Sequence, residues 1–324
     1  MKLDVHGEIW PVIVPFRITG VTFTSFQSIV VELSDGGHVG RGEALGVYYA
    51  NETISSMLEE VEALRSRIEQ GIDRTQLQGL LPPGGARNAI DSALWDLEAK
   101  ASGKTIWSLT GVAPKPLNTV FTIGLEDTPA QMAEKAAATK AGLLKIKLNG
   151  DRPVERLEAI RAARPDARLV VDANQGWDID QLHEVVGSAT RLNVEMIEQP
   201  LPRNADAALE GFQSPIPLCA DESCLHLGEL DAAVRRYQMI NIKLDKTGGL
   251  THALLLASEA RKRGLGLMVG CMGGSSLAMA PAFVIGCLAD LVDIDGPLLQ
   301  KSDRRHAIQY RNGMANVFGP ELWG

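Results

Sequence analysis

Charged residues stand at the ends of short apolar segments, at near-constant intervals along the second half of the chain. Ammonium and carboxylate groups in such positions can move protons and hold a metal ion. Together with Gly270, consecutive positions of this kind are 22 to 27 residues apart, which is the length of one strand, one helix and two turns. The charged residues are Lys147, Asp172, Glu198, Asp221 with Glu222, Lys243 and Asp293.

Eight predicted strands position these residues. Strands that alternate with helices at a regular interval predict an α/β fold, an eight-stranded (β/α)8-type barrel spanning residues 116–299. Residues 1–115 have the sequence pattern of a separate α+β unit. In residues 300–324 strands and helices no longer alternate, and this segment is expected to pack back on the α+β unit. The predicted strands are 119–123, 143–148, 168–174, 194–199, 216–222, 239–244, 266–271 and 289–295.

Two lysines share the inner face of the second predicted strand, LLKIKL. Its apolar residues Leu144, Ile146 and Leu148 alternate with Lys145 and Lys147, so both ammonium groups point into the barrel if the apolar face packs under the helices. A lone lysine at a strand end more commonly extends outward into solvent. The acidic residues on the next three strands favour the inward orientation.

The sixth strand, MINIKL, has the same alternation. Ile240, Ile242 and Leu244 form its helix-facing side, which directs Lys243 inward and leaves Lys246 on the other face. Since the second and sixth of eight strands lie opposite each other, Lys147 and Lys243 are predicted on opposite walls of the barrel mouth.

Carboxylates on three consecutive strands would repel one another without a cation. Asp172, Glu198 and either Asp221 or Glu222 supply oxygen ligands suited to Mg²⁺ before Ca²⁺ or Mn²⁺. Alternation does not choose between Asp221 and Glu222, and any one of these acids could instead cap the helix that follows its strand. Asn174 shares the face of Asp172 and is expected to support the ligands from behind.

Opposed lysines suggest a particular reaction. A carbon held between two amines, with its carboxylate on a metal ion, can lose a proton to one lysine and regain it from the other on the opposite face, which inverts its configuration. A lysine base needs a lowered pKa, and the positive charge of Lys145 and of the cation acts in that direction. Lys145 itself is expected to bind the substrate carboxylate.

Composition excludes several other functions. The 324-residue chain has a formal net charge of -8 and only short, scattered basic clusters, which argues against nucleic-acid binding. No signal peptide or membrane-length apolar segment is present, so a cytoplasmic protein without a membrane partner is expected. Four cysteines without CxxC spacing do not predict a disulfide framework or a zinc site. The oligomeric state is left open, a homo-oligomer included.

The motifs KIK, VDAN, IEQP, ADES and NIKLDKTGG, read together, resemble the enolase superfamily, and in particular its muconate-lactonising subgroup. The resemblance extends nearly end to end and implies an N-terminal capping domain over a modified (β/α)7β barrel. It also implies Asp172, Glu198 and Asp221 as ligands of one Mg²⁺ ion, with Lys147 and Lys243 as the acid/base pair. Glu222 then becomes a neighbour of the ligands.

The eighth strand narrows the reaction. NIKLDKTGGLT, GCMGGSS and DIDGP together resemble dipeptide epimerases of the L-Ala-D/L-Glu type, in which an Asp-x-Asp pair matching Asp293 and Asp295 holds the substrate α-ammonium. Thr122 resembles a position that contacts the substrate backbone. The implied reaction is epimerisation at the α-carbon of the C-terminal residue of a dipeptide.

The predicted capping loop, residues 19–25, departs from that family. Epimerases for Ala-Glu have an arginine in this loop, and Phe23 takes its place here, which favours a neutral or apolar second residue. The same subgroup contains N-acylamino-acid racemases and o-succinylbenzoate synthase-type dehydratases, which remain alternatives. A catalytically silent barrel used for binding is a third, although it predicts loss of the metal and lysine positions.

Overall fold

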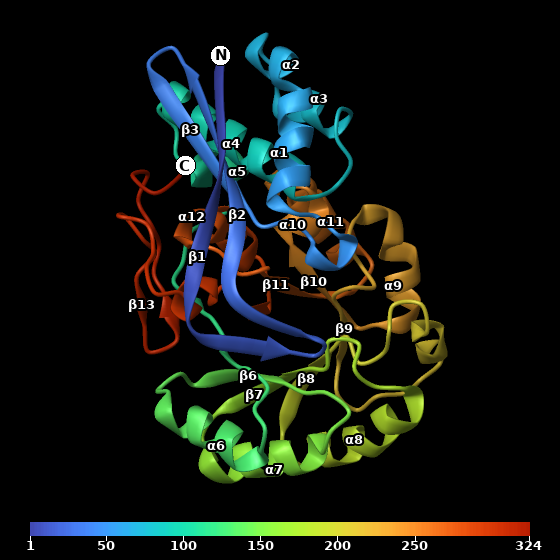
Figure 1. Ribbon diagram of the computed structural model, residues 1–324. Coiled ribbons are helices and arrows are strands. Elements are labelled where there is room, and N and C mark those ends of the chain that lie inside the picture. The colour runs from blue at the N-terminus through green and yellow to red at the C-terminus, as the bar shows by residue number, and fades with distance from the viewer.

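The computed structural model describes residues 1–324 and shows an N-terminal cap resting on a barrel (Figure 1). The cap consists of an antiparallel sheet, ordered β1-β2-β3, and helices packed against it. Its elements are β1 (Lys2–Ile18), β2 (Val21–Asp35), β3 (His38–Ala44), the 3-10 helix η1 (Tyr48–Ala50), α1 (Ile54–Ala63), α2 (Arg65–Glu69), α3 (Arg74–Gln78), α4 (Gly85–Ser102) and α5 (Ile106–Thr110).

Close packing of β3 on α4 forms the core of the cap. A Cβ atom at Gly40 would lie 2.2 Å from the Ala93 carbonyl oxygen, and one at Gly42 would lie 2.1 Å from that of Ala89. Glycine is therefore required at both positions for the strand to approach the helix this closely. A separate cluster of 15 buried apolar residues, including Ile29 and Ile90, fills the space between sheet and helices.

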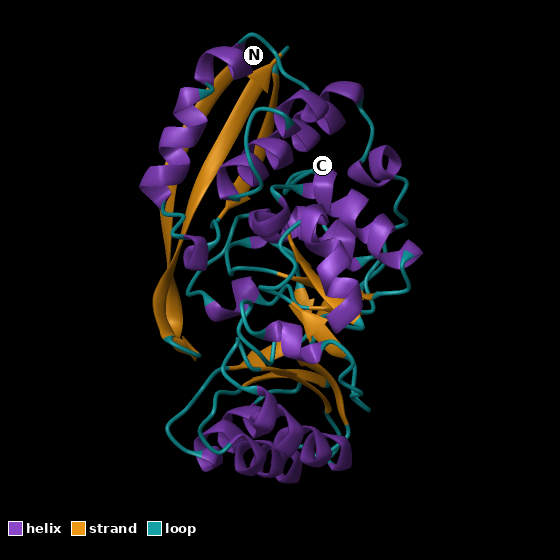
Figure 2. Cartoon of the chain, turned by 90° about the vertical axis from the view of Figure 1, so that its right-hand side faces the viewer, coloured by secondary structure: helices purple, strands orange, loops and turns teal.

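The segment predicted as a capping loop is mostly strand, so that prediction is wrong. β1 and β2 continue to a two-residue turn at Thr19 and Gly20, where Gly20 adopts a φ of +77°. The alternation of apolar and polar residues in VTFTSF suits a paired strand, and Phe23 lies opposite Phe16 in the register. The long hairpin reaches from the cap down to the barrel (Figure 2).

Eight parallel strands form the barrel, in the order β12-β11-β10-β9-β8-β7-β6-β5. A parallel bridge between Thr119 and Val292 joins the two ends of this sheet. The barrel strands are β5 (Phe121–Ile123), β6 (Leu143–Lys147), β7 (Arg168–Asp172), β8 (Val194–Glu198), β9 (Leu218–Ala220), β10 (Met239–Lys243), β11 (Gly266–Gly270) and β12 (Leu291–Val292).

Helices cover the outside of the barrel between successive strands, and after β12 a 3-10 turn follows in place of an α-helix. The predicted fold class is confirmed, and each predicted strand falls on an observed one. The connecting elements are α6 (Pro129–Ala138), α7 (Pro153–Ala163), α8 (Ile179–Arg191), η2 (Asp206–Leu209), η3 (Leu227–Glu229), α9 (Leu230–Arg236), α10 (Leu244–Thr247), α11 (Leu250–Lys262), α12 (Ser276–Gly286) and η4 (Gly296–Leu299).

The barrel interior is apolar at one end and charged at the other. Each of the eight strand segments contributes one buried residue to an apolar layer: Val120, Leu143, Val170, Met196, Cys219, Met239, Met268 and Leu291. Toward the carboxyl ends of the strands, the inward positions carry lysine and acidic side chains that are also buried. This polar end is where barrel proteins build their active sites.

Residues 300–324 contact both units and carry a short antiparallel pair, β13 (Tyr310–Arg311) and β14 (Met314–Ala315), next to β4 (Leu117–Asn118). Arg304 forms ion pairs with Glu8 and Glu43 of the cap sheet. The Trp323 indole donates a hydrogen bond to the Ser92 carbonyl of α4 at 3.0 Å. No helix of the chain is both long and apolar enough to cross a bilayer.

Candidate active site

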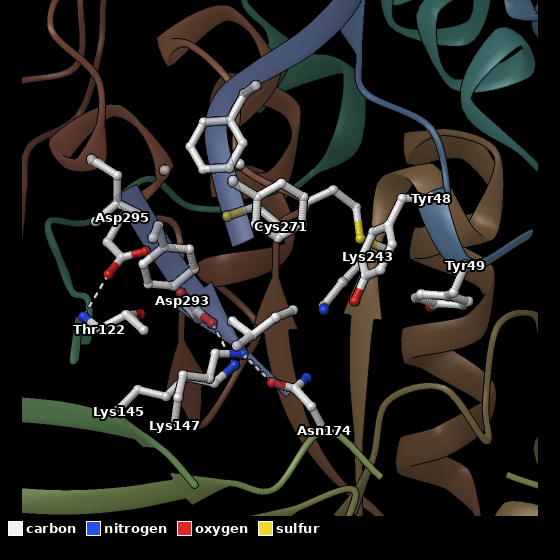
Figure 3. A pocket seen from close by; sticks show the side chains of 18 of the residues that line it. Tyr48, Tyr49, Thr122, Lys145, Lys147, Asn174, Lys243, Cys271, Asp293 and Asp295 are labelled. Carbon is white, nitrogen blue, oxygen red and sulfur yellow. Dashed lines mark hydrogen bonds and ion pairs between the residues drawn. The ribbon is translucent and has the colours of Figure 1, made fainter. Parts of the chain in front are cut away.

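A cavity of about 590 Å³ lies at the carboxyl ends of the barrel strands, beneath the cap hairpin. Its barrel side is charged and its cap side is largely aromatic (Figure 3). Of the residues predicted from the sequence, those that line it are Phe23, Thr122, Lys145, Lys147, Asn174, Glu222, Lys243, Asp293 and Asp295. The three predicted metal ligands lie just behind this lining and are completely buried.

Lys145 occupies the centre of the charged cluster. It is 1% exposed, and its Nζ lies 3.0 Å from Asp172, 2.7 Å from Glu198 and 2.7 Å from Asp293. Burial lowers the pKa of Lys145, but these carboxylates outweigh burial and raise the pKa well above its ordinary value. The Lys145 ammonium therefore joins the acids of β7 and β8 to Asp293.

Lys147 and Lys243 face the cavity from opposite walls, on β6 and β10, as alternation predicts (Figure 3). Lys147 Nζ donates to Asp172 Oδ2 at 2.6 Å and to Asn174 Oδ1 at 2.9 Å. Lys243 Nζ donates to Asp221 Oδ2 at 2.6 Å. Each of the two amines is thus held by one carboxylate beneath it.

Neighbouring carboxylates oppose the expected lowering of the pKa at Lys243. Burial and the charge of Lys145 lower its pKa, but the Asp221 and Glu198 carboxylates outweigh them and hold it well above its ordinary value. Asp221 lies only 2.6 Å away, so among the neighbouring charges it has the largest effect on the pKa of Lys243.

Lys246 belongs to this cluster, although alternation placed it on the wrong face. Its Nζ lies 2.7 Å from Asp221 Oδ1 and also donates to the carbonyl oxygens of Asp221, Cys224 and Asn241. The strand ends at Lys243 and α10 begins at Leu244, so the two-residue period no longer applies at position 246.

Ion pairing separates the pKa values of the three predicted ligands. Burial, together with the Asp172 carboxylate, raises the pKa of Glu198 to about 7. Burial raises the pKa of Asp172, but the charges of Lys145 and Lys147 outweigh burial and lower this pKa to about 2. Burial likewise opposes ionisation of Asp221, but Lys243 and Lys246 hold its pKa well below the usual range.

The donor set fits a hard divalent cation. Asp172 and Glu198 end β7 and β8, and Asp221 directly follows the adjacent strand β9. All three side chains are 0% exposed and offer only oxygen. Glu198 Oε2 accepts no aligned hydrogen bond, although the Lys145 ammonium lies 2.7 Å from it, and Glu222 Oε2 is buried without any hydrogen-bond partner. Buried carboxylates that are not saturated by hydrogen bonds are consistent with a cation as an additional partner.

Neighbouring residues hold the predicted ligands in place. Asn174, in the left-handed region with a φ of +44°, donates its backbone N–H to Asp172 Oδ1 at 2.9 Å while its side chain accepts from Lys147. Asn241 Nδ2 donates to Glu198 Oε1 at 2.6 Å. Asn241 was not predicted as a site residue. Its position on the inward face of MINIKL, two residues before Lys243, could have indicated it.

Asp293 and Asp295 lie side by side at the opposite end of the cavity from the Tyr48–Tyr49 segment (Figure 3). Their carboxylates and the Cys271 thiol have ligand atoms within 4.8 Å of one another. Asp295 Oδ2 accepts a 2.7 Å hydrogen bond from the Thr122 backbone N–H. Burial, with the charge of Asp293, raises the pKa of Asp295 to about 7.

Aromatic side chains form the cap side of the cavity. The Phe23 ring lies 5.8 Å from that of Phe26 and 5.6 Å from that of Tyr48, measured between centroids. The cap residues that line the cavity carry no charged group: Phe16, Ile18, Phe23, Phe26, Tyr48 and Tyr49. Neither tyrosine was predicted as a site residue, because both lie in a short 3-10 turn that has no periodic pattern.

The turn of the cap hairpin is fixed to the barrel rim. Thr19 Oγ1 lies 3.2 Å from the Leu148 carbonyl oxygen and 3.1 Å from that of Ala173, directly beyond the strand ends that carry Lys147 and Asp172. Arg17 donates to Asp127 Oδ1 at 2.8 Å, and its carbonyl accepts from the Leu125 N–H at 2.9 Å. Arg17 thus belongs to the strand and its attachment, outside the cavity lining.

A closed parallel barrel with lysines and carboxylates at its mouth, beneath an antiparallel cap, defines a barrel enzyme whose active site lies between the two units. Two family models match the chain: "Mandelate racemase / muconate lactonizing enzyme, N-terminal domain" over residues 2–111, and "Enolase C-terminal domain-like" over residues 130–319. The chain belongs to this family of the enolase superfamily.

Individual relatives agree with this assignment. The chain is 42% identical to the L-Ala-D/L-Glu epimerase of Escherichia coli (strain K12), over 96% of this chain and 98% of that protein. It is also 42% identical to an N-acetyl-D-glutamate racemase of Pseudoalteromonas sp, over 91% and 95% of the two chains.

Among solved structures, an enolase family member from Agrobacterium tumefaciens with bound sodium and L-Ala-L-Glu matches with a TM-score of 0.97. That protein is 42% identical, and the match covers 99% of both chains. These comparisons confirm the predicted superfamily and the class of enzyme, an isomerase.

Proposed function

We propose that the protein catalyses Mg²⁺-dependent epimerisation at the α-carbon of the C-terminal residue of a dipeptide. The observation that carries this proposal is the placement of Lys147 and Lys243 on opposite walls of one cavity, with Lys145 and the Asp293–Asp295 pair beside them. Relatives that are epimerases of dipeptides support the same reaction. A homo-oligomer and a cytoplasmic location stay predictions.

Asp172, Glu198 and Asp221 would hold the Mg²⁺ ion. When bound, the ion stabilises negative charge that develops on the substrate carboxylate during proton removal. The Lys145 ammonium, buried beside two of these acids, adds fixed positive charge for the same carboxylate. Asn241 and Asn174 keep the ligand side chains oriented through the hydrogen bonds described above.

The two opposed lysines exchange protons with the α-carbon. One amine removes the proton from its face of the substrate, and the ammonium on the other wall delivers a proton to the opposite face. In the reverse direction the roles are exchanged. Asn174 and Asp172 orient Lys147, and Asp221 orients Lys243, so that each Nζ is aimed at the cavity.

Hydrogen exchange tests the reaction directly. Incubation with a library of L-Ala-L-Xaa dipeptides in deuterated water should add one mass unit at the second α-carbon and produce the D epimer. If no dipeptide exchanges its α-hydrogen while Mg²⁺ still binds, the result would favour a catalytically silent barrel used for binding.

Removal of the Asp295 charge should separate dipeptide substrates from N-acylated ones. Because the pKa of Asp295 is about 7, kcat/KM for a dipeptide should rise through about pH 7 as the carboxyl ionises. It should fall again near pH ~8, where the α-amino group loses its proton. Asp295→Asn should lower kcat/KM by about tenfold or more and abolish the rise, measured from initial rates against pH.

N-acylamino-acid racemisation is the second candidate function. Lys145 already pairs with Asp293 at 2.7 Å, and a protonated Asp295 could donate a hydrogen bond to an acyl oxygen. An N-acetyl-D-glutamate racemase among the relatives supports this candidate. In that case kcat/KM for an N-acetyl amino acid should fall through about pH 7 and exceed that for the matching dipeptide.

The second residue of the substrate is proposed to be neutral or apolar. Relatives named for glutamate are similar to this chain, yet the cap side of its cavity carries no cation to meet a side-chain carboxylate. Phe23→Arg should raise kcat/KM for L-Ala-L-Glu relative to L-Ala-L-Leu by roughly 10- to 100-fold, the size of a charge-assisted hydrogen bond. Phe23→Leu is the control, and an equal change in both variants would contradict this specificity.

A further inference from the structure

A second cavity adjoins the active site on the outer side of the barrel wall. Its volume is about 1130 Å³, and it lies between residues 13–17 of β1, β5, α6 and the end of η4. Much of its lining is apolar, including Ile13, Val14, Phe121, Ile123 and Leu298. Only three residues line both this outer cavity and the active-site cavity: Phe16, Thr122 and Leu299.

These three residues form a partition beside the predicted ammonium site. The Thr122 backbone N–H donates to Asp295 Oδ2 at 2.7 Å. Leu299 ends η4, the turn that begins directly after Asp295. The Phe16 ring lies against Gly124, where a Cβ atom would be 3.2 Å from it, so the ring is held in place.

The first residue of a dipeptide must lie against this partition. Its α-carbon is bonded to the ammonium nitrogen, so an ammonium on Asp293 and Asp295 brings the first side chain near Thr122, which hydrogen-bonds to Asp295, and near Leu299, which lines the same cavity. On the neighbouring wall the Gly296 and Gly273 backbones are close together, since a Cβ atom at Gly296 would lie 2.9 Å from the Gly273 backbone, which leaves no room for a side chain between them.

We infer that Leu299 and Phe16 determine the specificity for the N-terminal residue of the substrate, restricting it to a small side chain. The inference rests on the proposed dipeptide epimerisation and goes beyond it, since that proposal concerns the C-terminal residue. Shortening Leu299 connects the two cavities, and the apolar outer cavity then receives a large aliphatic first residue.

Paired substrates test this specificity. Initial rates of α-hydrogen exchange are measured for L-Ala-L-Leu and L-Leu-L-Leu with the wild-type protein, Leu299→Ala and Leu298→Ala. Leu298 is the matched control, because it lines the outer cavity alone. The wild-type protein and Leu298→Ala should prefer the alanyl peptide by roughly 10- to 100-fold in kcat/KM, and Leu299→Ala should reduce this preference at least tenfold, mainly through KM for L-Leu-L-Leu.

Circular dichroism shows whether Leu299→Ala folds. If it does not, Leu299→Val and Phe16→Leu are smaller changes that also reduce the partition. Equal turnover of both peptides by the wild-type protein would overturn the inference. So would a substrate ratio that stays unchanged in every folded partition variant. Absence of exchange with all dipeptides would instead overturn the proposed function and this inference with it, so the two failures are distinguishable.

Discussion

Replacement of Lys243 by methionine should abolish epimerisation while one epimer of the dipeptide still exchanges its α-hydrogen. Lys147 remains in that variant and can remove a proton from its own face and return deuterium to the same face, with retention of configuration. Proton delivery to the opposite face has lost its general acid, the Lys243 ammonium. The loss of a general acid typically lowers the rate 10² to 10⁴-fold. Lys147→Met should show the converse result with the other epimer.

Both lysine variants are expected to fold. Without Lys243, Asp221 keeps the Lys246 ammonium at 2.7 Å, and without Lys147, Asp172 keeps Lys145 at 3.0 Å. Neither change therefore leaves a buried carboxylate without a positive partner. Lys262→Met is the control, since its ammonium is exposed and pairs only with Glu259. Exchange measured by mass spectrometry from each pure epimer gives the answer; loss of the same epimer's exchange in both variants would contradict opposed bases.

Alternation along strands explains why much of the site could be predicted. Lys145, Lys147 and Lys243 lie within regular strands, where a period of two fixes the direction of each side chain. The prediction failed for Lys246 because the strand had ended three residues earlier. The alternation of residues thus predicts the direction of a side chain only within the strand that produces the alternation.

Features of the cap were less accessible from the sequence. The 19–25 segment was predicted as a capping loop from the family resemblance, but pairing with β1 makes most of it strand. Tyr48 and Tyr49 lie in η1, which follows β3, and only the three-dimensional arrangement of the cap on the barrel brings them to the cavity. The partition at Leu299 depends on three segments far apart in sequence, and no spacing could reveal it.

Substitution of Glu198 by glutamine should remove Mg²⁺ binding while leaving the fold intact. Glu198 Oε2 lies 2.7 Å from the Lys145 ammonium, and Oε1 accepts from Asn241. A glutamine can direct its amide oxygen to Lys145 and its NH2 group to Asn241, whose Oδ1 has no partner and can accept after rotation of the Asn241 amide. Loss of the ion should lower kcat by roughly 10³-fold, because Lewis-acid stabilisation supplies several kcal/mol and each ~1.4 kcal/mol is tenfold in rate. Removal of Mg²⁺ from the wild-type protein with EDTA should have the same effect, and added Mg²⁺ should reverse it.

Thermal unfolding provides a measurement that does not depend on turnover. A ligand that binds only the folded state stabilises it by RT ln(1 + [L]/Kd), or ~2.7 kcal/mol at 100 times Kd, so Mg²⁺ should raise the wild-type melting temperature in a concentration-dependent way. Glu195→Gln is a matched control on the same strand, since Glu195 is exposed and pairs with Arg168 at 2.7 Å. That variant should keep the full Mg²⁺-dependent shift and Glu198→Gln should lose most of it. An undiminished shift in Glu198→Gln would place the ion elsewhere, and the oxygen ligands of β7, β8 and β9 would then serve only to neutralise the four buried lysines.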